Sequence, residues 1–359
     1  MRQFILRKTG YGLLVMLGVI TVIFMLFSVL PGDSAMMTMG QRSDVSSEEA
    51  VRKELGLDLP LGLRYINYLN DISPLSIHNQ TNTKSIFYLD KNKYEACILF
   101  KVGRENVLVA KKPYLGRSYQ SKRLVMEILN EAFPKTAILA LASIFFAILA
   151  GIVLGIFCAL FKDTWFDKTT LVVSVMGMSV PSFFAAILFA WVFAFLLADF
   201  TGLSMFGSLY TVSDFGEGEY LDLRNLLLPA LTLGIRPIAT VTQLMRNSVL
   251  EVMGQDYIRT TYSKGLSVFK IVKSHVVKNA LNPVVTAISG WLAGMMAGAV
   301  FVEYIFDYKG VGVVIVNGLE KYDFPVVMGS LLYISIILVV INIVVDVIYG
   351  FLDPRAKVK

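Results

Sequence analysis

Residues suited to catalysis or metal binding are sparse in this 359-residue chain. The two histidines, His78 and His275, lie far apart and belong to no His-Glu-x-x-His pattern, and the two cysteines, Cys97 and Cys158, are too few for a disulfide framework. No Gly-x-x-x-x-Gly-Lys-Ser/Thr phosphate loop is present. We therefore expect no catalytic site, no bound cofactor, no metal ion and no ATP site in the chain itself.

One charge stands out because it lies inside a long apolar run. Arg236 is about ten residues into the run 226–247, beside Pro237, where a charge facing lipid costs at least ~2.5 kcal/mol. It should therefore face the interior of a helix bundle. Either it lines a water-filled path, together with Gln243 and near a proline-kinked helix at Pro181, or it forms a buried pair. The acid would then be Glu303, Asp346 or one on a partner chain.

A polar segment at 251–282 separates two apolar runs and has the pattern of ordered structure. Residues 255–264 have helical spacing, with Tyr257, Ile258, Thr261 and Tyr262 on one face, and Gly265 supplies a left-handed helix end. Ser267 is suited to cap a second helix, which should end or kink at Pro283. The segment is either a docking surface at a membrane face or a basic loop near lipid headgroups.

Composition places these features in a membrane protein. Apolar residues make up 55% of the chain and charged residues 17%, against roughly 25% charged in globular proteins. Six apolar runs are long enough to cross a bilayer and predict six transmembrane helices. The first run is 11–30, in a helix that we extend to 31, and the others are 135–161, 171–198, 226–247, 284–306 and 326–351. The motifs Gly151-x-x-x-Gly155, Gly290-x-x-x-Gly294 and Gly294-x-x-x-Gly298 favour close helix packing.

Loop charges predict the orientation of these spans. The segments 162–170 and 248–282 and the tail 353–359 should share the cytoplasmic face with residues 1–10, whereas the loop 199–225 is acidic. Residues 32–131 then form an extracytoplasmic segment of about 100 residues after the first helix. Within it, 73–112 resembles an insertion, and the alternating stretches 96–102 and 107–110 predict a small β element.

Several motifs together resemble one family. Arg259-Thr260-Thr261-x-x-x-Gly265 is similar to the EAA-type coupling loop of ABC importer permeases, in the variant of peptide permeases, although Thr261 stands where the family usually has Ala. Further similar stretches are Pro31-Gly32-Asp33-Ser34-Ala35, Leu55-Gly56-Leu57-Asp58-Leu59-Pro60-Leu61, Val180-Pro181-Ser182-Phe183, Leu227 to Gly234, Glu303 to Phe306 with Gly310-Val311-Gly312, and Leu352-Asp353-Pro354-Arg355. In this order, they resemble the permease subunit of an oligopeptide or dipeptide ABC importer.

The resemblance implies an all-α membrane fold of the type I importer class, with a permease core over 132–352. It implies a multi-pass protein of a bacterial inner membrane with both termini in the cytoplasm. Its partners would be a homologous second permease, two ABC ATPases and an extracytoplasmic substrate-binding protein, and no nucleic acid. It also implies ATPase coupling through Asp256, Tyr257, Arg259, Thr260, Thr261, Gly265 and Leu266, and a translocation path that includes Pro181, Arg236 and Gln243.

Other functions stay open at this point. A nickel-chelate or glutathione importer would resemble this sequence closely. Proteins of other classes are also possible, namely a secondary transporter or a membrane adaptor that displays residues 73–112. Uptake by the chain without an ATPase would identify a secondary transporter.

Overall fold

The structure, a computed structural model, describes residues 2–29, 59–83, 85–90, 93–212 and 218–352. The chain divides into two compact units, which we describe separately. The first unit comprises Met1–Thr9, Ala132–Val313 and Ile337–Lys359, and the second comprises Gly10–Glu131 and Val314–Ile336. The predicted stretches at 31–35, 55–58 and 353–355 lie outside the described residues.

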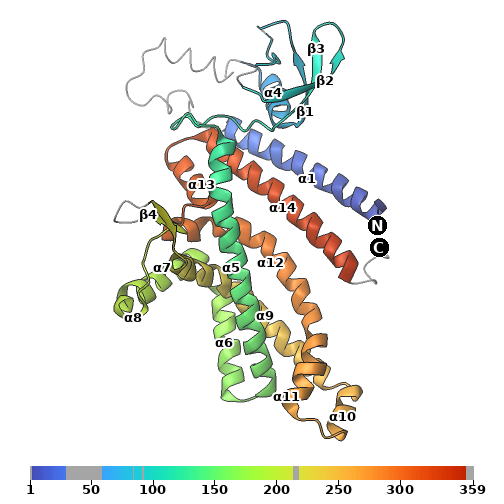
Figure 1. The fold of residues 1–359 in the computed structure, drawn as a ribbon, viewed down its shortest axis with the longest axis vertical. Coiled ribbons are helices and arrows are strands. Elements are labelled where there is room, and N and C mark those ends of the chain that lie inside the picture. The colour runs from blue at the N-terminus through green and yellow to red at the C-terminus, as the bar shows by residue number, and fades with distance from the viewer. Residues whose placement is uncertain (1, 30–58, 84, 91–92, 213–217, 353–359) are drawn as a thin grey trace. The chain divides into compact units, whose positions relative to one another are not determined.

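Helices dominate the first unit (Figure 1). Its main elements are α5 (Val125–Leu160), α6 (Trp165–Ser179), α7 (Ser182–Trp191) with the π-helical continuation Val192–Leu196, α8 (Ala198–Thr201), the hairpin β4 (Tyr210–Val212) and β5 (Glu219–Leu221), α9 (Arg224–Met253), α10 (Asp256–Ser263), α11 (Val268–Ile271) with the π-helical continuation Val272–Val276, and α12 (Val277–Phe306). Two further helices, α13 (Val311–Glu320) and α14 (Phe324–Leu352), contribute to both units, as does α5.

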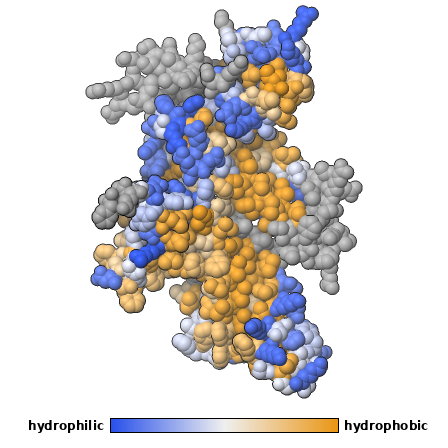
Figure 2. Space-filling model, in the orientation of Figure 1, coloured by the Kyte–Doolittle hydropathy of each residue, from blue (hydrophilic) through white to orange (hydrophobic). Residues whose placement is uncertain are grey.

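Helices occur at all six predicted spans. Among the described residues, four helices have the length and hydropathy of a membrane span, namely α5, α9, Arg7–Ser28 of α1 (Arg2–Val29) and Phe324–Val345 of α14. The helices α6 and α7 form a fifth only as a bent pair, and α12 covers the predicted span 284–306. Figure 2 shows that the long helices of the first unit have a largely hydrophobic surface, with hydrophilic side chains gathered around α10 and α11.

The third predicted span is broken rather than kinked. The axes of α6 and the helix that follows differ by 113°, and Val180 between them has extended backbone angles (φ −73°, ψ 129°). A residue that precedes proline is disfavoured in the α conformation, so Pro181 ends α6 at this point. The break leaves carbonyl groups at the end of α6 without partners in the helix.

Glycines bring α5 and α9 together in the first unit. A Cβ atom on Gly151 would lie 2.6 Å from Val241 Cγ1, and one on Gly155 would lie 2.6 Å from Met245 Cβ. The predicted motif Gly151-x-x-x-Gly155 therefore packs one helix closely on another. Gly290 and Gly294 of α12 behave differently, because a Cβ there would meet no atom within 4 Å.

In the second unit, a short helix and a small sheet form what we call the sheet subdomain, residues 61–112. It consists of α4 (Leu61–Ile72), β1 (Leu75–Asn79), β2 (Ala96–Val102) and β3 (Asn106–Lys111). The strands are antiparallel in the order β1-β3-β2, and their inner face buries Val107 and Val109 with Leu89 and Tyr94. The predicted β element is confirmed as β2 and β3. The third strand, β1, lies outside the two alternating stretches and was not predicted.

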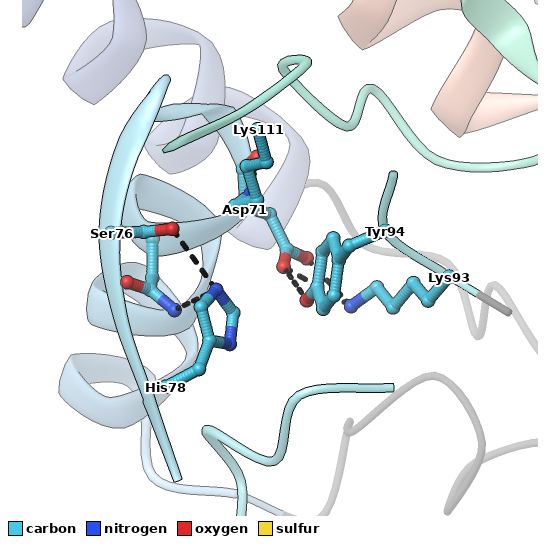
Figure 3. A network of polar contacts seen from close by, with 7 residues as sticks. Asp71, Ser76, His78, Lys93, Tyr94 and Lys111 are labelled. Carbon is cyan, nitrogen blue, oxygen red and sulfur yellow. Dashed lines mark hydrogen bonds and ion pairs between the residues drawn. The ribbon is translucent and has the colours of Figure 1, made fainter. Parts of the chain in front are cut away.

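Polar side chains fill the rest of the subdomain core (Figure 3). The Asp71 carboxylate accepts hydrogen bonds from Lys93 Nζ at 3.0 Å and from the Tyr94 hydroxyl, and Lys111 Nζ donates to the Asp71 carbonyl at 2.6 Å. His78 Nε2 lies 3.0 Å from Ser76 Oγ. Burial lowers the pKa of Lys111 to about 8, lowers the pKa of His78 and raises that of Tyr94.

Candidate coupling and translocation sites

The coupling segment, residues 255–266, consists of α10 and the glycine turn that follows it. Ile258 is fully buried in a cluster with Met245 and Val249 of α9 and with Ile271 and Val276 after the turn, and Leu266 packs against the same cluster. These two apolar residues anchor a helix that is otherwise polar. Of the four residues predicted to share one face, Tyr257 and Tyr262 are exposed and only Ile258 and Thr261 turn inward.

The remaining coupling residues face outward. Asp256, Arg259 and Thr260 are exposed, and their polar bonds are local: Arg259 lies 3.5 Å from Asp256, and Thr260 Oγ1 donates to the Asp256 carbonyl. Tyr257 accepts a hydrogen bond from Asn279 Nδ2 at 3.0 Å. Exposed polar groups with such short-range bonds leave a surface on which another protein can dock.

Gly265 has the left-handed conformation predicted for it. Its φ is +75°, and a Cβ there would meet no atom within 4 Å. Glycine is therefore required by the backbone angle and not by packing. The turn ends α10, and Ser267 then occupies the predicted cap position, although its side chain makes no capping hydrogen bond. The helix that follows does not end at Pro283 and continues to Phe306, which leaves only a kink among the two predicted outcomes.

Of the three predicted path residues, Arg236 and Pro181 lie at the break between α6 and α7, and Gln243, two turns further along α9, lies beside the last turn of α6. Arg236 of α9 donates from Nη2 to the Val180 carbonyl at 3.2 Å, directly before Pro181, and Gln243 Nε2 lies 3.9 Å from Met178 Sδ. A cation at a helix C-terminus is favourable because the helix dipole is negative there. Arg236 is half-buried, and its Nε has no hydrogen-bond partner among the described residues.

The buried-pair alternative for Arg236 receives no support from Glu303. Glu303 is fully buried and accepts a hydrogen bond from the backbone N–H of Gly312 at 2.6 Å. Any Cβ on Gly310 would collide with its carboxylate, and Val311 N donates to Thr136 Oγ1 at 2.9 Å. Glu303 therefore fixes the Gly310-Val311-Gly312 turn. The Asp346 side chain lies outside the described residues.

Sequence reasoning missed an ion pair behind the coupling segment. Arg246 of α9 donates two hydrogen bonds to Asp167 in the first turn of α6, at 2.6 and 2.7 Å, and the Asp167 side chain is 2% exposed. The Asp163 backbone N–H also donates to Asp167. The pair joins two helices near the cluster that holds Ile258. The available signal was a charge at the end of each apolar run, which does not identify the partner.

Comparison with known proteins decides the family. Residues 151–358 match the family described as "Binding-protein-dependent transport system inner membrane component", and residues 1–85 match its N-terminal family. The chain belongs to this family. The prediction of an importer permease with an all-α membrane fold of the type I class is thereby confirmed.

Curated relatives match this chain over nearly its whole length. A putative peptide transport system permease protein of Brucella abortus (strain 2308) is 32% identical over 99% of both chains. The di/tripeptide transport system permease protein DppB of Pseudomonas aeruginosa is 30% identical over 99% of both chains. The dipeptide transport system permease protein DppB of Escherichia coli (strain K12) is 28% identical over 100% of both.

No metal centre is found in the part of the chain that the structure describes, where no three His, Cys, Asp or Glu side chains lie close enough together. Cys97 is exposed and Cys158 is buried, and both are free thiols.

Proposed function

We propose that the chain is the membrane subunit of a peptide importer, and that its coupling segment transmits nucleotide-driven motion of an ATPase to the helix bundle. The observation that carries this proposal is the architecture of α10. It exposes Asp256, Arg259 and Thr260 while Ile258 attaches it to the long helices α9 and α12 of the first unit. The names of the relatives, which are peptide and dipeptide permeases, support the substrate class.

The proposed assembly contains a second, homologous permease, two ABC ATPases and an extracytoplasmic binding protein, in an inner membrane. The exposed small residues Gly290 and Gly294 on α12 support a second membrane chain, because no atom of the described residues lies within 4 Å of where their Cβ atoms would be. Both termini lie in the cytoplasm in this arrangement, on the side of the basic coupling segment.

Uptake by reconstituted vesicles tests the proposal. The chain is reconstituted with ABC ATPases, a second permease and a binding protein of the same organism, and labelled di- and tripeptides are offered. We expect uptake that requires ATP and the binding protein. Uptake by the chain alone without ATP would instead indicate a secondary transporter, and uptake of a nickel chelate or of glutathione with no peptide uptake would contradict the substrate class.

For the translocation path we propose that Arg236 binds the substrate carboxylate, near Pro181 and Gln243. Its guanidinium is positioned at the helix break, and its Nε has no partner within the described residues. Arg236→Gln should leave the complex assembled and lower the uptake of peptides with a free carboxylate more than that of amidated peptides. Arg236→Lys keeps the charge and should retain part of the preference. Loss of assembly with an unchanged preference would show that Arg236 only holds the α6 end.

We propose further that the segment 73–112 contacts the binding protein. The two ends of the segment lie side by side, since Lys111 N donates to the Pro74 carbonyl at 2.9 Å and Leu75 pairs with Ala110. Its deletion should therefore leave an inserted, ATPase-bound complex whose uptake from the binding protein falls. Unchanged uptake would show that the segment has no part in transport.

A further inference from the structure

Helix α4 contacts α1 well before α1 ends. Tyr65 OH lies 2.6 Å from Thr21 Oγ1, and the ring centroids of Tyr65 and Tyr68 lie 5.1 and 5.6 Å from that of Phe24. At a rise of about 1.5 Å per residue, Phe24 and Thr21 lie about 8 and 12 Å before Val29, the last described residue of α1. Because residues 7–28 have the length and hydropathy of a membrane span, these contacts lie at the depth of its outer two or three turns.

The circumference of α4 is mostly apolar. Arg64, Asn67 and Asp71 form a polar stripe at intervals of three and four residues, and Asn70 lies beside it. Asp71 binds Lys93 and Tyr94 in the sheet subdomain, and Asn70 Nδ2 lies 3.4 Å from His78 Nε2. Tyr65 and Tyr68 face α1. Of the other apolar side chains, Ile72 is buried and Leu69 is half-buried, whereas Leu63 is 38% and Ile66 51% exposed. Leu61, one turn before Tyr65, is 43% exposed.

These exposed residues continue a surface that already faces lipid. At the same level, α1 exposes Val22, Met25 and Leu26, as a membrane span with few protein neighbours does. A helix that lies in the membrane interface places its apolar face about 5–10 Å into the headgroup and acyl boundary, which agrees with the depth of Phe24. Tyrosines favour that zone, and a long basic side chain such as Arg64 can reach the headgroups.

We propose that α4 is an interfacial helix, with Leu63 and Ile66 inserted among the lipids of the leaflet in which α1 ends. The polar stripe then faces the sheet subdomain and the aqueous phase. In this arrangement α4 holds the subdomain at a fixed height above the bilayer, independently of any partner protein.

Depth-dependent quenching in the assembled complex tests the proposal. Cys97→Ser removes the exposed native thiol, and Cys158 is buried. Single cysteines then replace Leu63, Ile66 or, as the matched control, the neighbouring Asn67, and each carries a fluorescent label in nanodiscs. We expect the labels at 63 and 66 to lose fluorescence with lipid spin-labelled near the top of the acyl chain. The label at 67 should instead respond to aqueous iodide.

Two results would overturn the proposal. Iodide quenching at 66 equal to that at 67 would place α4 in water. Labels at 63 and 66 that neither lipid nor iodide quenches would show that another protein covers this face. If cysteine at 66 prevents assembly, a photoreactive residue at the same position gives a second measurement, with adducts to phospholipid expected and adducts to protein alone contradicting it.

Discussion

The sheet subdomain and the coupling segment are both polar stretches between apolar spans, but they use their charges in opposite ways. In the subdomain, Asp71, Lys93 and Lys111 turn inward and bind one another or the backbone. In the coupling segment, Asp256 and Arg259 turn outward, with side chains 97% and 76% exposed. One region satisfies its polar groups internally, and the other presents them.

This difference indicates what stabilises each region. An exposed ion pair such as Arg259–Asp256 contributes about 0–1 kcal/mol at most, so the coupling segment depends on Ile258, Leu266 and the helices behind them. The subdomain depends on its own charged core. Changes to surface charges should therefore affect docking in the first region, whereas changes to internal charges should affect folding in the second.

The largest effect should come from the ion pair between Asp167 and Arg246, behind the coupling segment. Asp167→Asn leaves the Arg246 guanidinium, 14% exposed, without its counter-ion, which costs about 3–5 kcal/mol for a buried pair. We expect a lower melting temperature of the purified complex and loss of ATPase binding. Asp163→Asn, with a side chain 77% exposed, is the control and should behave like the wild type. Equal stability of the two variants would contradict the importance of the pair.

A smaller and more local effect is expected in the subdomain. Asp71→Asn weakens the charge-assisted bonds from Lys93 and Tyr94, at about 1.5–3 kcal/mol, so amide hydrogen exchange of residues 75–111 should accelerate while ATPase binding persists. Glu95→Gln removes an acid whose pair with Lys112 is exposed and should leave exchange unchanged. Protection of 75–111 in Asp71→Asn equal to that of the wild type would show that the apolar core alone holds the sheet.

The coupling turn should respond to backbone strain alone. Gly265→Val places a β-branched residue at φ +75°, at a cost of about 1–2 kcal/mol. We expect weaker co-purification of the ATPases and reduced uptake, with normal membrane insertion. Gly265→Asn, which tolerates this conformation, should retain most of both activities. Normal coupling in the valine variant would exclude the glycine turn from docking.

The smallest effect is the pH dependence of the subdomain. Burial lowers the pKa of Lys111 to about 8, below its ordinary value near 10.5, so the unfolded segment binds this proton more tightly. Stability should therefore rise with pH from about 8 to 10.5 and be lowest below pH 8, as far as Lys111 is concerned. The lowered pKa of His78 acts in the same direction near pH 6.5, and the raised pKa of Tyr94 opposes it only above pH 10.

Lys111→Met isolates this effect. Hydrogen exchange of residues 75–111, corrected for intrinsic rates, should become more protected between pH 8 and 10 in the wild type and change less in the variant. An identical trend in wild type and variant would assign the dependence to another group.

Local patterns in the sequence predicted much of the architecture. Uninterrupted apolar runs predict the long helices because a membrane span needs about 20 residues without charge. Alternation at 96–110 predicts β2 and β3, and Gly265 predicts the turn, because side-chain period and backbone angle are properties of neighbouring residues. The spacing of Gly151 and Gly155 likewise predicts that another helix packs closely there, but it does not predict that this helix is α9.

Only the tertiary structure decided which groups meet. Arg236 could have paired with an acid, and it bonds the Val180 carbonyl because α9 passes the point where Pro181 breaks the preceding helix. Asp167 and Arg246 meet across 79 positions, and α4 lies against α1 across 44. Such pairings depend on how the helices pack and on which polar groups are left without a hydrogen-bond partner when the helices are buried. The spacing of residues along a single helix or strand does not predict these pairings.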